Sequence, residues 1–471
     1  MPNTRFFPLR AALAFVFCLP VLLGACSLAP KYTRPNAPVP NAYNQGAPLP
    51  NQAIQDIAWR DFFKEPTTRQ LIELALANNR DLRVSMLNIE KTRAQYRVQR
   101  ADLLPTVAAA ADSNSQQLPS EFMPTGEASI SRRYSATLGF SAFELDLFGR
   151  IRSLSDQALE TYYSVAEDAK TAQISLIAEV AGVYLQLIAD RELLDITKAT
   201  YKNRKGQYDL VSNKFQSGVA SQLEVSQARS IMEEARSNVA RYSTSVGQAE
   251  NYLALLLGTP LPKNMPELRK LSQVQVLADL PAGLPANLLE RRPDILAAEH
   301  RLKGANANIG AARANFFPRI SLTGALGTIS GDFSDLFGSG NHFWQFLPSV
   351  SLPIFDTGRN IATLQVSEAD RKIAVAQYEK TIQAAFREVA DTLVQRQHIG
   401  EQMAAESALL KSTTTTYNLA SARYDVGVDS YLNVLDAQRS LYNAQRSYIN
   451  TKLLRETNAL TLFKALGGGW K

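Results

Sequence analysis

The chain has 471 residues, a formal net charge of +6 and 20% charged residues. These values are ordinary for a folded protein and argue against a largely disordered chain. No Lys/Arg cluster follows a groove, so nucleic-acid binding has little support. No metal site is expected either. Both cysteines lie within the first 26 residues, and the histidines are scattered without ligand spacing (His300, His342 and His398).

The N-terminus reads as a secretory signal covering residues 1–25. Arg5 and Arg10 supply a basic region, and the apolar run 11–23 is too short for a routine membrane span. The segment ends in Leu23-Gly-Ala-Cys26, which resembles the lipobox of bacterial lipoproteins. That resemblance implies that Cys26 is acylated and becomes the mature N-terminus, and Ser27 after it favours the outer membrane. The alternative is an ordinary signal with an incidental cysteine.

A proline-rich stretch at 30–50 predicts an extended, lipidated tether over residues 26–66. A first repeat, 67–258, follows. Its first helix begins near Thr67 and stops before Pro105. Two strands of a β-hairpin are then expected at 106–115 and 134–148, where positions 136, 138, 140 and 142 alternate with 137, 139, 141 and 143.

A long helix opens at Gly149-Arg150 and is expected to reach about Asn213, which is roughly 95 Å at the rise of an α-helix. The chain then turns at Gly218 and returns as a helix along 222–257. The absence of proline from this stretch supports uninterrupted helices. The narrow apolar stripe of the long helix favours a coiled coil or a ring of helices over the buried spine of a globular domain.

The same pattern recurs in a second repeat, 286–467, after a proline-rich linker at 259–285, and a tail at 468–471 ends the chain. The turn at Gly218 falls on Gly427 when the sequence is shifted by 209 residues. The second hairpin has strands expected at 319–330 and 344–356, and a helical pair runs from Gly358 to Leu466. The chain is therefore a duplicated unit of β-hairpin and helical hairpin.

The four strands cannot form a closed barrel alone, and an open sheet edge cannot lie in lipid. Bacterial membrane barrels need at least eight strands, so the strand count allows a dimer, a trimer or a tetramer. No catalytic motif stands apart from the helical surface charges, so no enzymatic activity is expected.

The sequence resembles the TolC-type outer-membrane factors of tripartite efflux pumps, most of all the OprM-type multidrug efflux lipoproteins, over essentially the whole mature chain. The resemblance rests on the lipobox and on several short motifs, which are Trp59-Arg-Asp-Phe-Phe63, Glu144-Leu-Asp-Leu-Phe-Gly149, Glu290-Arg-Arg-Pro-Asp-Ile295, Arg423-Tyr-Asp-Val-Gly-Val428, Leu435-Asp-Ala-Gln-Arg439 and the Ala465-Leu-Gly-Gly-Gly-Trp470 tail. It implies a mixed α and β membrane protein. In that family three chains form a 12-stranded transmembrane β-barrel, continued by a periplasmic α-helical barrel.

Two turns are the functional ends in that family. Gly218 and Gly427 suit a left-handed turn, Ser221 and Glu224 form a capping box, and Ser430 can cap its counterpart helix. Leu432 and Asp436 share one helix face. The resemblance places the closed periplasmic aperture at Leu432 and Asp436, with Leu223, Gln227, Glu224, Arg423 and Tyr424. It places the surface gripped by the adaptor at Gly218, Val219, Ser221, Gly427, Val428, Asp429 and Ser430.

Each of these residues also has an ordinary structural explanation. Glu224 can be only a cap, Leu432 ordinary interhelical packing, Asp436 a solvated charge, and Arg423 and Tyr424 plain surface residues.

The function implied by the resemblance is a passive outer-membrane exit channel of an RND-type multidrug pump, opened by a periplasmic membrane-fusion adaptor and powered by an inner-membrane transporter. No cofactor is expected beyond the lipid on Cys26. The alternatives are a metal-efflux or type I secretion duct, or a structural envelope lipoprotein.

Overall fold

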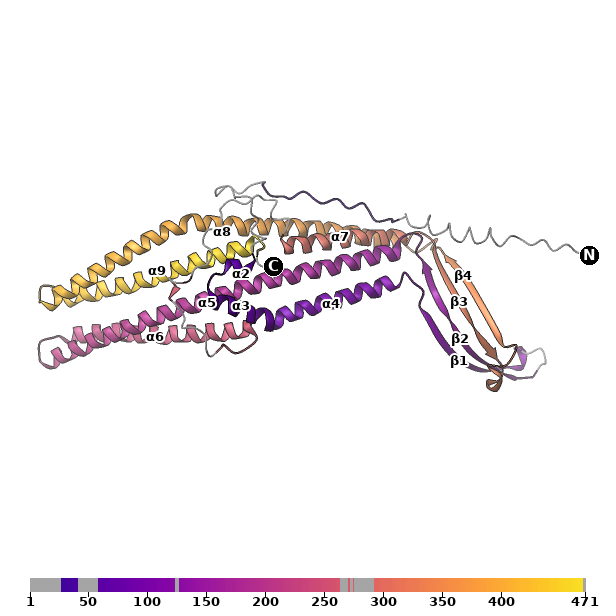
Figure 1. Cartoon of the computed structure of the whole chain (residues 1–471), viewed down its shortest axis with the longest axis horizontal. Coiled ribbons are helices and arrows are strands. Elements are labelled where there is room, and N and C mark those ends of the chain that lie inside the picture. The colour runs from indigo at the N-terminus through magenta and orange to yellow at the C-terminus, as the bar shows by residue number, and fades with distance from the viewer. Residues whose placement is uncertain are drawn as a thin grey trace, which may run out of the picture. The chain divides into compact units, whose positions relative to one another are not determined.

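The computed structural model describes residues 27–40, 58–122, 127–262, 270–271, 274 and 292–468. Figure 1 shows long helices and one curved β-sheet. In chain order the elements are α2 (Trp59–Phe62), α3 (Pro66–Asn78), α4 (Arg80–Ala101), β1 (Val107–Leu118), η2 (Ser120–Phe122), β2 (Ser129–Leu145), α5 (Arg150–Gln216), α6 (Gln222–Leu257), α7 (Pro293–Ala314), β3 (Arg319–Ser330), η5 (Phe333–Asp335), β4 (His342–Ser351), α8 (Arg359–Asp425) and α9 (Tyr431–Ala465).

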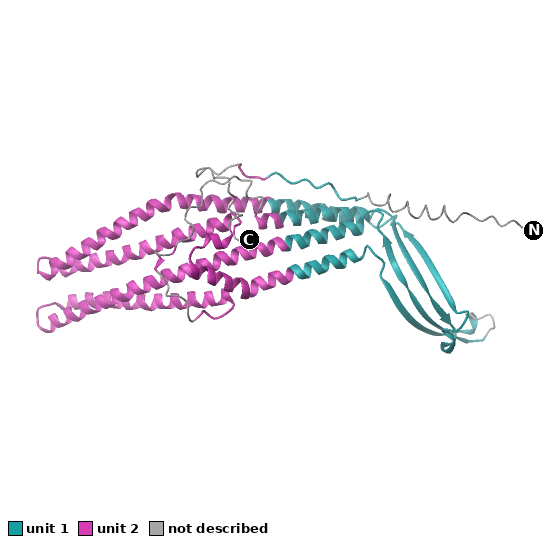
Figure 2. Ribbon diagram, in the orientation of Figure 1, with its two compact units in different colours: residues 1–36, 89–165, 298–378 teal, residues 37–88, 166–297, 379–471 magenta. Residues whose placement is uncertain are grey.

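The chain divides into two compact units, which Figure 2 colours separately. Unit 1 holds residues 1–36, 89–165 and 298–378 and contains all four strands. Unit 2 holds residues 37–88, 166–297 and 379–471 and contains both helical turns. Each unit draws on both repeats, so the duplication seen in the sequence does not correspond to two separate domains.

The first predicted helix is divided in two at Asn79, which is a correction to the sequence interpretation. Asn79 has extended backbone angles and ends α3. Its Oδ1 accepts the Leu82 N–H at 2.8 Å and its Nδ2 donates to the Leu256 carbonyl at 2.9 Å. The side chain thus caps α4 and ties α3 to the end of α6. The sequence pattern missed the break because the helical spacing continues across it.

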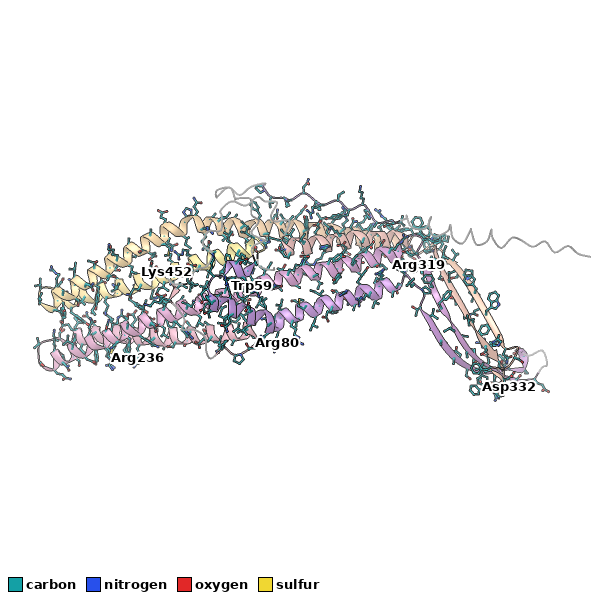
Figure 3. All side chains as sticks on the ribbon, viewed as in Figure 1. Trp59, Arg80, Arg236, Arg319, Asp332 and Lys452 are labelled. Atoms are coloured by element: carbon teal, nitrogen blue, oxygen red, sulfur yellow. The ribbon has the colours of Figure 1, made fainter. Side chains whose placement is uncertain are left out.

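The four strands form one antiparallel sheet in the order β1-β2-β3-β4. The two hairpins pair through β2 and β3, where Leu138 lies opposite Leu326. Figure 3 marks Arg319 at the start of β3 and Asp332 just beyond its end. Within the described residues, β1 and β4 each have a strand on only one side, so both edges present unpaired backbone groups.

One face of this sheet is apolar. A row across the sheet, defined by the pairing register, contains Ala109, Leu138, Leu326 and Trp344, and further apolar rows contain Gly324 with Phe346, Leu322 with Pro348, and Ile320 with Val350. The opposite face carries mostly small and polar residues, including the hydrogen-bonded pair Ser321 and Ser349, with Ile329, Phe343 and Leu347 as large apolar exceptions. The sheet is therefore amphipathic, as the alternation in the sequence indicates.

A β-bulge corrects the predicted alternation in β2. The sequence pattern put Phe143 on the face opposite to Phe140. In the structure the pairing skips from Phe140 to Phe143, while β3 advances only from Gly324 to Leu322. Ala142 adopts a positive φ of 53° and its N–H donates to Thr323 Oγ1 at 3.0 Å. The extra residue returns Phe143 to the apolar face.

Helix α5 contains a stretch that is long and apolar enough to cross a membrane. Ile177, Val180 and Leu187 on this helix are nevertheless almost completely buried. The stretch thus serves as a core helix of unit 2.

An aromatic cluster forms part of the core of unit 2. Phe62 stacks on Phe463 with ring centroids 4.0 Å apart, and Phe63 packs on the same ring edge-on. Trp59, which Figure 3 labels on α2, is also buried. The motif Trp59–Phe63 therefore anchors the segment before α3 to the end of α9.

Arg292 shows what part of the Glu290–Ile295 motif does in the fold. The guanidinium is buried and donates to the Ala465 carbonyl at 2.7 Å, to Asp294 at 2.7 Å and to Glu388 at 3.0 Å. It joins the start of α7 to α8 and to the end of α9 within unit 2. Desolvation alone would lower the pKa of Arg292, but the two carboxylates outweigh it and raise the pKa further. Glu290 and Arg291 lie outside the described residues.

The described part of the tether lies against α7 in unit 1. Its backbone carbonyls at Leu28 and Pro30 accept hydrogen bonds from Arg313 and Asn306, at 3.2 and 2.7 Å. A Cβ on Gly310 would lie 2.8 Å from the Ala29 nitrogen, so the close approach requires a glycine at this position. The segment is extended, as predicted, and is fixed to the helix by specific bonds.

Glu299 holds the next part of the tether. Its carboxylate is 4% exposed and accepts bonds from Arg34 Nε at 3.0 Å and from the Tyr32 hydroxyl at 3.1 Å, with Lys303 3.4 Å away. Burial by itself would raise the pKa of Glu299, but the Arg34 bond and the Lys303 charge outweigh it and hold the pKa below its usual range.

We expect docking of the tether to fail in acid. Because the pKa of Glu299 is lowered in the folded protein, its contribution is present at neutral pH and is lost as the pH falls below about 4. Hydroxyl-radical footprinting should show side chains of residues 28–34 protected at pH 7, with protection declining below about pH 4, because the tether is bound through Tyr32, Arg34 and its carbonyls. Glu299→Gln should remove the protection at every pH, whereas Glu160→Gln, a variant of a carboxylate paired with His300 in the same unit, should keep it. Unchanged protection in Glu299→Gln would contradict this role.

Candidate functional site at the hairpin tips

The two helical turns have the same backbone geometry. At the first, the Gly218 N–H donates to the Phe215 carbonyl and the Val219 N–H to the Lys214 carbonyl, both at 2.9 Å. Gly427 and Val428 make the equivalent bonds at the second, also at 2.9 Å. Gly218 and Gly427 have φ of 76° and 78°, which an L side chain adopts only with strain. Both helices therefore end in a Schellman motif, which needs these glycines.

The helices restart by different means. Ser221 and Glu224 form the predicted capping box at the start of α6. Ser430, by contrast, makes no side-chain capping bond at the start of α9, so the prediction of a Ser430 cap is wrong. Asp429 instead orders the entry into α9: its Oδ1 accepts the Ser430 N–H at 2.9 Å, and its carboxylate also binds the side chains of Asn433 and Arg423. The sequence shows a residue that can cap a helix, but the folded backbone decides whether its side chain does so.

These bonds also act on the charge of Asp429. The hydrogen bonds from Asn433 and from the Ser430 N–H lower its pKa, and Arg423 adds to the effect at 3.3 Å. Arg423, which was predicted to form part of the aperture, therefore bonds Asp429 in the same hairpin tip. Asp429 was predicted to contact the adaptor.

An apolar cluster joins the two hairpins near their tips. Its buried members come from α5, α6 and α9 and are Val211, Ala228, Tyr431, Val434 and Leu435. Burial, with a smaller contribution from the phenols of Tyr424 and Tyr417, raises the pKa of Tyr431 to about 12. The neutral phenol thus packs as part of the cluster.

Tyr424 connects the tips directly. Its ring lies 5.3 Å from that of Tyr431, and its hydroxyl accepts a bond from Lys214 Nζ at 3.3 Å. The same ammonium lies 5.0 Å from the centre of the Tyr424 ring, which favours a cation–π contact. Lys214 on the first hairpin therefore contacts Tyr424 on the second hairpin through its ammonium group. The sequence analysis missed Lys214 because nothing in its local sequence indicates a partner on another helix.

Three of the predicted aperture residues line one cavity. Gln227 on α6 and Leu432 and Asp436 on α9 border a space of about 290 Å³. Leu432 is 60% exposed, so it does not pack as an ordinary interhelical residue in the single chain. Asp436 forms an ion pair with Arg439 on its own helix. The predicted residues Leu223 and Glu224 lie on the first turn of α6 and do not border this cavity.

Several apolar side chains at the two turns are open to solvent. Val219 is 78% exposed and Val428 is 65% exposed, and Leu223 is exposed nearby. Figure 1 shows the α5–α6 and α8–α9 turns at the same end of unit 2. Exposed apolar side chains thus lie at both turns, where the sequence analysis placed the contact with the adaptor.

The described residues also bear on the predictions made for the histidines and cysteines. No group of three or more His, Cys, Asp or Glu among them could hold a metal ion. His300 is paired with Glu160 at 2.6 Å. Cys26 lies outside the described residues, so its lipidation stays a prediction.

Comparisons with known proteins agree with this geometry. A sequence model described as outer membrane efflux protein matches residues 71–259 and 284–468, which is most of both repeats. The chain belongs to the outer membrane efflux protein family. The two matched ranges also separate at the linker that the sequence analysis placed between the repeats.

Relatives of this efflux protein support the assignment. It is 48% identical to the probable efflux pump outer membrane protein TtgC of Pseudomonas putida, over 95% of this chain and 94% of that protein. It is 44% identical to the outer membrane protein OprJ of Pseudomonas aeruginosa, over 95% and 94% of the two chains.

Solved structures agree as well. A membrane protein from Pseudomonas aeruginosa aligns with a TM-score of 0.86 and 42% identity, covering 94% of this chain and 98% of that one. The open state of the MtrE outer membrane channel of Neisseria gonorrhoeae aligns with a TM-score of 0.86 and 37% identity, covering 95% and 99%. This efflux protein is thus an outer-membrane protein of a Gram-negative bacterium, similar to known efflux channels.

Proposed function

We propose that this efflux protein is a homotrimeric exit channel of an RND-type tripartite multidrug pump. It passively conducts small molecules delivered by an inner-membrane transporter through a periplasmic adaptor. The observation that carries the proposal is the amphipathic four-stranded sheet with two open edges.

The sheet indicates how the channel assembles. Open strand edges cannot lie in lipid, so β1 of one copy must pair with β4 of another if the apolar face meets the membrane. Three copies supply twelve strands, which is within the range of bacterial barrels. The small and polar face then lines the pore, and the aromatic residues of β4, Trp344 and Phe346, face the lipid.

The lipid anchor fits the same assembly. The described tether begins at Ser27, and Leu28 is bonded to Arg313 near the end of α7, a few residues before β3 begins. An acyl chain on Cys26 would therefore enter the membrane close to the start of the barrel strands.

The hairpin tips supply the gate and the adaptor contact in this proposal. Leu432 and Asp436 project from α9 beside Gln227 of α6, so three copies would form a ring of leucines and a ring of carboxylates. Exposed Val219 and Val428 would meet the adaptor, because apolar patches on protein surfaces commonly mark binding sites.

The test is conductance of the purified full-length protein in planar bilayers, together with its mass in detergent. We expect a trimer that gives small, stepwise currents, because the gate is closed without its partners. A monomer, or a trimer that conducts no current even under large applied voltage, would favour a structural lipoprotein instead.

A further inference from the structure

The pairing of β2 with β3 provides a template for the two open edges of the sheet, which are β1 and β4 (Figure 1). Residues 100–105 correspond to residues 313–318, so Val107 in β1 corresponds to Ile320 in β3. In the same way, β2 and β4 are the second strands of their hairpins, and each leads to a Gly-Arg pair before a long helix. Because β2 pairs with β3 within the chain, β4 of one copy can pair with β1 of the next copy in an equivalent register.

The bulge in β2 fixes how its residues correspond to those of β4. The residues opposite Val107 and Ile320 in the two hairpins are Phe140 and Val350, respectively. Phe140 therefore corresponds to Val350. Between this point and the glycine before the long helix, β2 has one residue more than β4, and the bulge contains that extra residue. Beyond the bulge, Phe143 therefore corresponds to Leu352.

The register between two copies follows from these correspondences. Within the chain, Phe140 lies opposite Gly324 and Phe143 lies opposite Leu322. The counterparts of Gly324 and Leu322 in β1 are Ala111 and Ala109. We propose that β4 of one copy pairs with β1 of the next copy with Val350 opposite Ala111 and Leu352 opposite Ala109. This inference rests on the proposed channel and adds to it the residues at which two copies meet.

The backbone of β4 is oriented as this register requires. The Ile329 N–H donates to the Asn341 carbonyl at 2.9 Å across the β3–β4 pair. Successive residues of an antiparallel strand direct their backbone groups to alternate sides, so the groups of the even-numbered residues of β4, such as Val350, point to its free edge. Pro348 has no N–H and removes one bond from the new ladder. A shift by one residue would bring the apolar face of β4 beside the polar face of β1.

Apolar side chains are exposed at both edges where the sheet meets the helices. Ile354 and Phe355, which follow β4, are 88% and 86% exposed, and Leu104 before β1 is also exposed. Leu104 corresponds to Phe317, which stacks on Phe148 within the chain with ring centroids 4.7 Å apart. The same junction therefore has a partner inside the chain at β3 and lacks one at β1. In the proposed register, Ile354 and Phe355 of the neighbouring copy supply this partner.

Disulfide cross-linking of the full-length protein in membranes tests the register. Ser351 and Ala110 lie opposite each other in the proposed pair, and opposite residues have Cα atoms about 4.5–5.5 Å apart, within reach of a disulfide. Ser351→Cys combined with Ala110→Cys should therefore give covalent dimers and trimers on oxidation. Asp112→Cys in place of Ala110→Cys should give none, because diagonal neighbours are about 7–8 Å apart.

A cysteine pair within the chain serves as the control. Ser321 and Ser349 lie opposite each other with hydroxyl oxygens 2.7 Å apart. Ser321→Cys with Ser349→Cys should lose both thiols on oxidation without linking copies, which shows that the sheet is folded and accessible to the oxidant. Each single variant should stay unlinked, which excludes Cys26 as the partner.

Two results would overturn the proposed register. In one, the variant with Asp112→Cys links copies and the variant with Ala110→Cys does not. In the other, neither variant links copies although the pair within the chain oxidises. If the protein then has the mass of a trimer, the register alone is wrong and the proposed channel stands. If it has the mass of a monomer, the proposed channel fails together with the register.

Discussion

Leu432→Ala and Asp436→Ala are each expected to raise the single-channel conductance of the purified protein several-fold. The exposed leucine narrows the proposed aperture by its volume, and its truncation removes three side-chain tips from one ring. The aspartate acts by charge and by its ion pair with Arg439, which keeps both side chains in place. The measurement is conductance in planar bilayers at matched salt, since exposed charges are screened as salt rises.

Two further variants make this test specific. Leu419 on α8 is also 60% exposed but does not border the cavity, so Leu419→Ala should leave the current unchanged. Asp436→Asn keeps the size and removes the charge, so it should change ion selectivity more than pore width. If Leu432→Ala and Leu419→Ala give equal currents through a working channel, the gate lies elsewhere in the protein.

Phe463→Ala is expected to destabilise unit 2 by about 3–5 kcal/mol, as is typical for removal of a buried aromatic ring. Phe463 is 1% exposed and packs against both Phe62 and Phe63. Its loss leaves a cavity and detaches the segment before α3 from the end of α9. The measurement is the urea dependence of the helical circular-dichroism signal in detergent.

The controls for this core prediction are also phenylalanine substitutions. Phe463→Leu keeps most of the volume and should cost clearly less than the alanine variant. Phe316 is 41% exposed, so Phe316→Ala should shift the midpoint little. If Phe463→Ala is as stable as the natural protein, the aromatic cluster does not stabilise the end of α9.

Local features of the site were predictable because they depend on short-range geometry. The two glycines and the Ser221 capping box act through bonds that span only three to five residues. The prediction for Ser430 failed because a serine at this position can cap the helix, but only the folded backbone decides whether its hydroxyl bonds the first turn. The bulge at Ala142 escaped detection because one extra residue leaves no mark in an alternating pattern.

Contacts between residues far apart in the chain could not be predicted from the sequence. Lys214 and Arg204 lie in polar stretches of α5 that read as solvated surface, yet one bonds Tyr424 and the other is buried beside Glu234. Such contacts join residues far apart in the chain, and only helix packing brings them together.

The sequence by itself determined the duplication, the long helices, the amphipathic strands and the two glycine turns, because these follow from periodicity and backbone preference. Only the tertiary structure decided that each compact unit contains residues of both repeats and that the tether is bonded to α7. It also decided that the buried guanidinium of Arg204 borders the cavity between the hairpins. These depend on which helix faces meet, and many residues placed far apart in the chain set that outcome together.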